Sequence, residues 1–201
     1  MHSIQRILLF FAILIFQLTG SMPVFCSEES QSATEDDIRS AIETLNRAIA
    51  EKNTPMRNKM YFKFRLIEQD KPGLVAPFLI ENLKIDQEGV PEYTAFILGW
   101  VGDKRAIEPL REMLKTSASK KEHAMRALGF MQAKEAFPDI SGLLSDSDPR
   151  VRQTAAYSLG LMGDDQAVPL LQKAKEDTDE LVRFFAEEAI ERIDNYKKFG
   201  W

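Results

Sequence analysis

The side chains that most often perform catalysis are scarce in this sequence. Its 201 residues include one cysteine, Cys26, and two histidines, His2 and His123. A Ser-His-Asp triad needs an exposed nucleophile beside a histidine, and no G-x-S-x-G turn accompanies His123. The paired acids Asp164 and Asp165 are better explained as a helix cap and a solvated face than as a general acid and base. We therefore expect no catalytic site, no metal and no cofactor.

A second set of side chains is suited to binding a protein. Its charged members alternate in sign, which suits a protein partner better than a polyanion. The chain has 26 basic and 31 acidic side chains and a net charge of −5, which argues against nucleic acid as the partner, because release of counterions from phosphates needs a basic surface. The candidate partner-binding residues are Arg105, Glu108, Arg111, Lys134, Asp139, Gln172, Lys173, Tyr196, Phe199 and Trp201.

Most of these candidates lie in an internal repeat. The segments Leu98–Leu110, Leu128–Ile140 and Leu159–Leu171 align without a gap, at spacings of 30 and then 31 residues. Each copy has a Leu-Gly pair, an alanine seven residues after the glycine, and an apolar residue four further on. Self-similarity at this period predicts a solenoid in which each copy forms a helix, a tight turn and a second helix.

Small residues in the first helix of each copy predict close packing between copies. Glycine inside a helix costs about 1 kcal/mol relative to alanine, so three glycines at one phase indicate that neighbouring helices approach closely there. The aromatic residues beside the Leu-Gly pairs are expected in the core rather than in a binding site. The glycines are Gly99, Gly129 and Gly160, the small residues before them are Thr94, Ala124, Ala155 and Ala186, and the aromatic residues are Trp100, Phe130 and Tyr157.

The turn between the two helices has its own signature. Gly102 and Gly163 are placed to end the first helix with a positive φ angle, and Asp103 and Asp164 follow as N-caps of the second helix. The middle copy has the pair 132–133, Gln-Ala, in place of Gly-Asp, so its turn is expected to be looser.

The N-terminal residues differ from the repeats. The segment Ile7–Leu18 is almost wholly apolar, but as a helix it would reach only about 18 Å, less than the roughly 30 Å of a hydrocarbon core. Residues 1–26 are therefore expected to be a cleaved signal peptide, which predicts a periplasmic or secreted protein. The alternatives are an uncleaved anchor that faces the periplasm and a lipoprotein lipidated at Cys26. Residues 27–37 predict an acidic disordered spacer whose end starts a helix, and the apolar stripe in 38–52 predicts that this helix caps the repeats.

The segment Asp148–Leu171 reads D-P-R-V-R-Q-T-A-A-Y-S-L-G-L-M-G-D-D-Q-A-V-P-L-L and resembles the short HEAT-like repeats named after phycobilisome lyases. The resemblance is strong over residues 90–193. Residues 54–83 fit as a divergent copy, because Leu66 and Pro77 each lie 32 residues before a counterpart in the next copy. The resemblance implies an all-α solenoid of stacked antiparallel helix pairs with a concave, partner-binding surface, which we expect the second helices to line.

The resemblance also implies roles for two arginines and argues against two activities. Repeats of this kind commonly use arginine to bridge adjacent units, so Arg152 and Arg183 are expected to bind carboxylates, with Asp148 and Asp179 as acceptors. The HEAT-like deoxyhypusine hydroxylases bind iron through paired His-Glu dyads, whereas His123 would be the only histidine of the mature chain. Phycobilin lyases act in the cytoplasm, whereas an export signal is expected here.

The sequence as a whole predicts a non-catalytic scaffold or adaptor of the cell envelope that binds a protein on the concave face of an α-solenoid. The alternatives are a membrane-tethered lipoprotein adaptor and, less favoured, an accessory subunit or lyase-like enzyme with a ligand in the groove. The aromatic C-terminal tail either caps the last helices or binds a partner.

The chain is expected to divide into a signal peptide (1–26), an acidic spacer (27–37), a repeat domain (38–193) and the aromatic tail (194–201). Within the repeat domain we expect a capping helix at 38–52, repeats at 54–84, 90–115, 119–145 and 149–176, and a half repeat at 180–193.

Overall fold

The computed structural model describes residues 33–199, and the expected signal peptide, Cys26, most of the acidic spacer and Trp201 lie outside that range. Residues from Glu35 onward form one compact unit. Within the described range the unit holds ten α-helices and no strand, which confirms the predicted all-α class. The helices are α2 (Glu35–Ala50), α3 (Thr54–Asp70), α4 (Ala76–Asn82), α5 (Val90–Val101), α6 (Ile107–Met113), α7 (Ala118–Phe130), α8 (Phe137–Gly142), α9 (Pro149–Met162), α10 (Val168–Ala174) and α11 (Glu180–Phe199).

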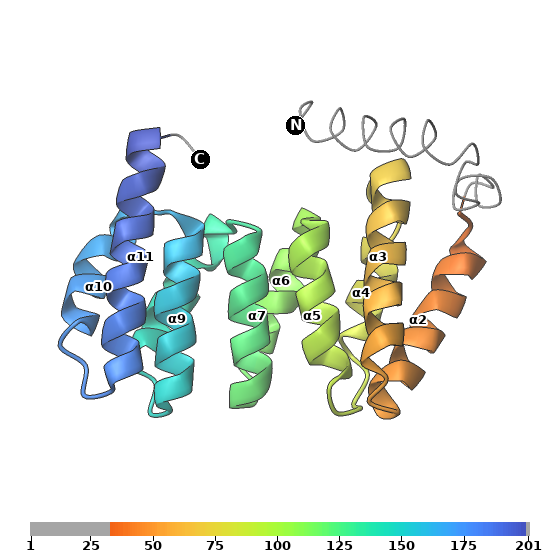
Figure 1. Ribbon diagram of the computed structural model, residues 1–201, viewed down its shortest axis with the longest axis horizontal. Coiled ribbons are helices and arrows are strands. Elements are labelled where there is room, and N and C mark those ends of the chain that lie inside the picture. The colour runs from red at the N-terminus through yellow and green to blue at the C-terminus, as the bar shows by residue number, and fades with distance from the viewer. Residues whose placement is uncertain (1–32, 200–201) are drawn as a thin grey trace, which may run out of the picture. The chain divides into compact units, whose positions relative to one another are not determined.

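The helices pack as sequential antiparallel pairs in a solenoid. The first helices, α3, α5, α7, α9 and α11, stand side by side in one row, and the shorter second helices lie behind them (Figure 1). Neighbouring first helices pack extensively on each other from α5 to α11, whereas the second helices pack on first helices rather than on one another. Helix α2, which begins with three acidic residues in its first turn, packs on α3 and α4 at the start of the row.

The repeated glycines mark where the first helices meet. A Cβ atom on Gly99 would lie 2.8 Å from the Ala127 Cα, and one on Gly160 would lie 2.7 Å from the Ala189 Cα. Both distances are well below carbon–carbon contact, so any side chain at these positions would push the helices apart. Close packing of backbone on backbone therefore joins α5 to α7 and α9 to α11, as the spacing of the glycines predicts.

Turns between paired helices follow the expected glycine–aspartate pattern in two copies. Gly102 and Gly163 have φ angles of +74° and +67° and end α5 and α9. The carboxylates of Asp103 and Asp164 each accept a hydrogen bond from the backbone N–H two residues further on, where a short 3-10 helix leads into α6 or α10.

The middle turn is not looser than the others, contrary to the expectation. Gln132 takes a φ angle of +51° without the help of glycine. Its N–H donates to the Gly129 carbonyl at 3.0 Å, and the next N–H, of Ala133, donates to the Leu128 carbonyl at 3.0 Å. The chain therefore keeps the tight turn and places a side chain in the left-handed region, which ordinarily costs roughly 1–2 kcal/mol.

Arginine does bridge adjacent units, but through a different acceptor from the one expected. The Arg152 guanidinium forms a two-pronged contact with Asp177 at 2.8 and 2.9 Å, and it also donates to the Asp146 carbonyl. One unit earlier, Lys121 binds the Asp146 carboxylate at 2.8 Å, so the link recurs along the solenoid. The hydrogen bond from each cation holds the pKa of its carboxyl, Asp177 or Asp146, below the usual value.

The acceptors predicted for these arginines have other partners. Asp148 caps α9 and pairs with Arg150 at 2.9 Å, and Asp179 accepts a hydrogen bond from Gln153 at 3.0 Å. Arg183 donates to two main-chain carbonyls of the loop before its own helix rather than to a carboxylate. The prediction missed these contacts because the bridging carboxylate lies two residues earlier in the loop than the aspartate that caps the helix.

The divergent first unit has a different register from the one expected. Leu66, aligned above with the buried leucine of the later copies, is 64% exposed. Helix α3 instead buries Met60, Phe64 and Ile67. Pro77 lies in the first turn of α4, where its missing N–H needs no partner.

The C-terminal residues continue the last first helix instead of forming a separate tail. Helix α11 runs unbroken to Phe199, and the ring of Tyr196 covers Gly163 so closely that a Cβ on that glycine would lie 2.7 Å from the ring carbon Cδ2. Lys197 pairs with Asp165 at 2.9 Å, whereas Phe199 is 69% exposed. Tyr196 thus packs back on the preceding unit.

The exposed side of α11 carries both acidic and apolar residues. Glu187, Glu188 and Glu191 are exposed and stand 31 residues after Ala156, Tyr157 and Gly160, whereas Leu181 and Phe184 are 53% and 52% exposed. The glutamates supply the polar residues that a terminal solenoid unit needs in order to stay soluble. Between residues 33 and 199 no helix is both long and apolar enough to cross a membrane.

Candidate partner-binding groove

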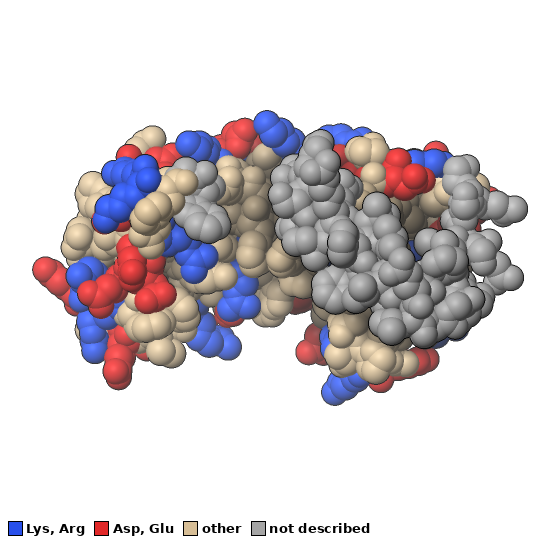
Figure 2. Space-filling model, turned by 45° about the horizontal axis from the view of Figure 1, so that its top comes forward, with Lys and Arg blue, Asp and Glu red and all other residues tan. Residues whose placement is uncertain are grey.

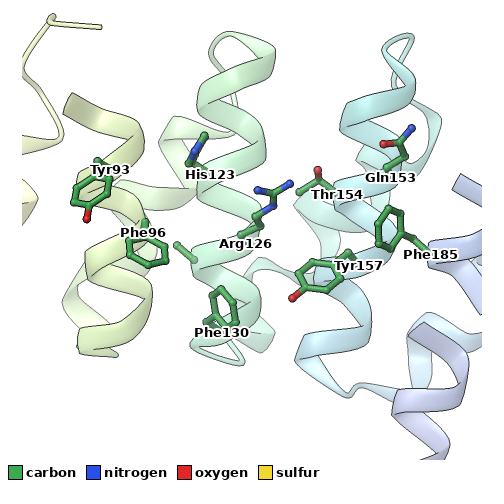
Figure 3. Close-up of a pocket in the computed structure, with 10 residues that line it drawn as sticks. Tyr93, Phe96, His123, Arg126, Phe130, Gln153, Thr154, Tyr157 and Phe185 are labelled. Carbon is green, nitrogen blue, oxygen red and sulfur yellow. The ribbon is translucent and has the colours of Figure 1, made fainter. Parts of the chain in front are cut away.

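A groove runs across the row of first helices. It has a volume of about 540 Å³ and draws its lining from α5, α7, α9 and α11 (Figure 3). Aromatic rings and a few polar side chains face into it. The lining residues are Tyr93, Phe96, His123, Arg126, Ala127, Phe130, Gln153, Thr154, Tyr157 and Phe185.

The lining comes from equivalent positions in successive units. Tyr93, His123 and Thr154 each lie five residues before the leucine of a Leu-Gly pair, and Phe96 and Tyr157 lie two residues before one. Positions three apart lie on the same face of a helix, so the two sets form adjacent lines on the row. Because each first helix buries its opposite side against the second helices, the repeat places these side chains on the outer face of the row.

The aromatic residues form a connected network on this face. Phe96 lies with its ring centroid 5.6 Å from that of Tyr93 and 6.4 Å from that of Trp100. Trp100 stacks on Phe130 at 5.2 Å. Such pairs contribute about 0.5–1.5 kcal/mol beyond the area they bury, so the network stiffens the surface that it covers.

Two of the aromatic residues expected in the core are in fact exposed. Trp100 is 47% exposed and Phe130 is 38% exposed, and Tyr157, which is half-buried, lines the groove. The prediction was wrong because the residue after the Leu-Gly pair lies about a third of a turn beyond the glycine, on the outer face rather than between helices.

The aromatic surface continues toward the first unit. Tyr61 of α3 lies 5.5 Å from Phe96 and 6.5 Å from Trp100, and Phe62 and Leu66 beside it are 58% and 64% exposed. In the space-filling view, charged side chains of both signs gather over the C-terminal units on the left, whereas uncharged surface predominates over the middle of the row (Figure 2).

The charge of the groove lining is positive. Its only permanently charged member is Arg126, which is exposed, and no aspartate or glutamate is among the lining residues. His123, one turn earlier on α7, contacts the Ser119 carbonyl through Nδ1 at 2.9 Å. Burial raises the pKa of the Tyr93 hydroxyl above its usual value, so this ring presents a neutral hydroxyl at the end of the groove.

No three histidine, cysteine, aspartate or glutamate side chains of residues 33–199 come together as a metal site. His123 lines the groove together with Arg126 and Gln153, and on its other side it lines a second hollow together with Asp86, Glu88 and Glu92.

The binding residues predicted from the sequence lie elsewhere. Several form contacts between units on the side of the second helices: Arg111 of α6 binds Asp139 of α8 at 2.6 Å and also Glu108, and Arg105 binds Asp103 and the Gly73 carbonyl. These contacts hold the stack together and leave the side chains less free to bind a partner.

The remaining predicted residues are scattered. Lys134 lies in the short helix before α8, and Gln172 and Lys173 lie on α10, all exposed. Tyr196 packs on the preceding unit, as described above. None of the residues that line the groove on the first helices was among the predicted binding residues. The expectation that the second helices line a concave binding surface stays a prediction.

Two parts of the chain match models of helical repeats. Residues 115–191 match the model of HEAT repeats, and residues 90–116 match that of the PBS lyase HEAT-like repeat. The structure is similar to a chain in the complex of CpcE and CpcF of phycocyanin lyase from Nostoc sp. PCC7120, with a TM-score of 0.59 and 21% identity, covering 90% of this chain and 72% of that chain. Among curated proteins no significant match to the sequence is found.

Proposed function

We propose that this HEAT-repeat protein is a non-catalytic scaffold or adaptor that binds a protein partner in the groove on its first helices. The observation that carries the proposal is the exposed aromatic network along that groove. Phe, Tyr, Trp and Arg are the side chains enriched at protein interfaces and at their energetic centres. Here Phe, Tyr and Arg side chains line the groove, and Trp100 stacks on one of its rings, Phe130. A stacked solenoid supplies a stiff support, so little ordering is needed on binding.

Similarity to a lyase complex supports a protein partner, because the solved relative is itself described as a complex of two proteins. Its fold is shared with this chain at 21% identity. The role proposed here therefore rests on the groove of this chain.

We place the protein in the cell envelope, as a periplasmic or secreted protein. The support is the short apolar run at Ile7–Leu18 within residues 1–26. An uncleaved anchor or lipidation at Cys26 would instead hold it at the membrane. Mass spectrometry of the N-terminus of the protein purified from its native host separates the three outcomes.

A second candidate function is an accessory subunit or lyase-like enzyme that holds a small ligand. The volume of the groove, about 540 Å³, falls within the range of ligand pockets, and aromatic walls suit a flat ligand. This alternative predicts that the purified native protein carries a bound chromophore or other small molecule. The scaffold predicts a co-purifying protein instead.

The test is an affinity purification from native cells with three forms of the full-length chain as bait. Phe96→Ala with Tyr157→Ala removes two rings of the groove, and Lys134→Glu with Lys173→Glu reverses two exposed charges, one in the short helix before α8 and one on α10. The proposal expects a partner that is retained by the wild type and by the lysine variant and is lost from the aromatic variant. Partner loss from the lysine variant alone would place binding on the second helices and refute the proposed face. Circular dichroism verifies that each variant is folded.

A further inference from the structure

One cation stands in the groove without a partner. Among residues 33–199, the Arg126 side chain has no hydrogen bond and no ion pair, although the chain contains more acids than bases. Most of the other arginines form hydrogen bonds or ion pairs within the chain: Arg105 binds Asp103, Arg111 binds Asp139, and Arg152 binds Asp177. An arginine that is left unpaired inside an aromatic groove is available to a ligand.

The repeat shows that Arg126 is an exception rather than a general feature of the fold. The equivalent positions one unit before and one unit after it are Phe96 and Tyr157. Figure 3 shows the guanidinium of Arg126 between His123 and Thr154, with Phe96 and Phe130 on one side of it and Tyr157 and Phe185 on the other. Among the lining residues, the groove therefore has two aromatic subsites with Arg126 as the cation between them, and Arg192, outside the lining, lies over the Tyr157 ring at 5.4 Å.

This arrangement constrains the chemistry of what binds. An apolar segment laid across the groove would remove Arg126 from water, and an unpaired buried cation is costly. A carboxylate on the segment would offset that cost, because it can accept two parallel N–H bonds from the planar guanidinium. No lining residue supplies a carboxylate, so the ligand must bring it.

The observations also favour a protein segment over a polyanion. One arginine is too little charge for a nucleic acid or an anionic lipid surface, which bind through clusters of cations. The aromatic subsites on both sides call for bulky apolar groups flanking the charge, as amino-acid side chains provide along a chain.

We infer that the groove recognises a segment of the partner protein in which an aspartate or glutamate is flanked on both sides by bulky apolar side chains. In the complex, Arg126 binds the carboxylate, and the rings of Phe96 and Phe130 and of Tyr157 and Phe185 take the apolar side chains. This inference rests on the proposed function, because it names the kind of partner segment that the groove accepts.

The experiment uses a display library of random peptides, selected for binding to the full-length chain. The expected result is enrichment of peptides with one acid between bulky apolar residues. For the best peptide, synthesised with a fluorophore, Arg126→Gln should weaken binding by about 10- to 100-fold, the loss for a hydrogen bond to a charged group. Lys173→Gln, at an exposed lysine of the second helix α10, is the matched control and should bind as the wild type does.

A double-mutant cycle tests whether the two charges meet. Changing the acid of the peptide to its amide should cost as much as Arg126→Gln, and the two changes together should cost little more than either alone. The Arg126 side chain has no partner among the described residues, so its substitution should leave the melting temperature unchanged. The loss of peptide affinity can then be assigned to the missing contact with the peptide and not to unfolding.

Three results would overturn the inference. The first is a library that yields no enriched peptide, or peptides without an acid. The second is that the peptide binds Arg126→Gln as tightly as the wild type but no longer binds the variant with both Phe96→Ala and Tyr157→Ala. The groove would then remain the binding face, but it would not recognise a carboxylate of the peptide. The third is octanoate binding as tightly as the best peptide, which would point to a small acid as the ligand. Binding that is insensitive to both the arginine and the aromatic variants would refute the proposed function as well.

Discussion

The substitution Gly160→Ala tests the packing that holds the groove open at fixed width. Its new Cβ would lie 2.7 Å from both the Cα and the Cβ of Ala189, roughly 1 Å inside normal carbon–carbon contact. The neighbour is backbone and a methyl group, so neither can rotate away, and α9 and α11 must separate. Overpacking of this kind destabilises the folded state by about 1–3 kcal/mol. Replacing glycine by alanine in a helix opposes this with a stabilisation of about 0.4–1 kcal/mol, because it reduces the conformational freedom of the unfolded chain.

The expected net loss is about 1–2 kcal/mol, which lowers the melting temperature by about 2–8 °C for a domain of this size. Gly142→Ala is the matched control, because a Cβ there meets nothing within 4 Å and its φ angle is ordinary. The control should be neutral or stabilised by up to about 1 kcal/mol. Thermal unfolding followed by circular dichroism measures both variants. If Gly160→Ala were as stable as Gly142→Ala, the inference of backbone-to-backbone packing between the first helices would be wrong.

Three further changes should alter stability. Gln132→Gly relieves the positive φ angle in the middle turn and should stabilise the chain by about 1 kcal/mol, and a lower urea midpoint would show that the turn is unstrained. Ser158→Ala removes a buried hydroxyl that has no hydrogen-bond partner among the described residues and should raise the melting temperature, since the adjacent units have alanine there. Arg152 lowers the pKa of Asp177 in the folded state. The ion pair therefore contributes its full stabilisation to the folded state above the pKa of about 4 that aspartate has in the unfolded chain, and this stabilisation is lost as the pH falls through the lower folded-state pKa. The difference in melting temperature between the wild type and Asp177→Asn should therefore be largest near neutral pH and shrink in acid, and a constant difference would contradict the assignment.

Features that depend on neighbouring residues in the chain could be predicted from the sequence. The period follows from Leu-Gly pairs, the turns from Gly102 and Asp103 or Gly163 and Asp164, and the close helix contacts from glycines at one phase. Each of these rests on backbone conformation or size, which a residue type largely decides. The one false expectation of this kind, a looser middle turn, failed because the chain tolerates Gln132 in a left-handed conformation rather than change its path.

Features that depend on which faces meet could not be predicted in the same way. Trp100 and Phe130 are large and apolar, as core residues are, and only the packing of the first helices on one another shows that they lie outside it. The groove has a sequence signal nonetheless. Aromatic residues recur five and two positions before the Leu-Gly pair, in Tyr93, Phe96 and Tyr157, and these positions share one helix face.

The same limit explains the predicted binding residues. Arg111 and Asp139 are charged, and on a sequence they look free to bind a partner. In the structure they bind each other across two units at 2.6 Å. Ionic side chains can be assigned to contacts within the stack or to a partner only when their distances are known, and the carboxylate that receives Arg152 was mistaken by two residues for that reason.

The most direct test of the binding face is site-specific photo-crosslinking in the native host. A photoreactive phenylalanine analogue replaces Phe130 in the groove in one strain and Lys173, exposed on the second helix α10, in a second strain, and both are irradiated in living cells. The account predicts a crosslink to one discrete protein from position 130 and none from position 173. A crosslink from position 173, with none from position 130, would contradict the account and move the binding face to the second helices.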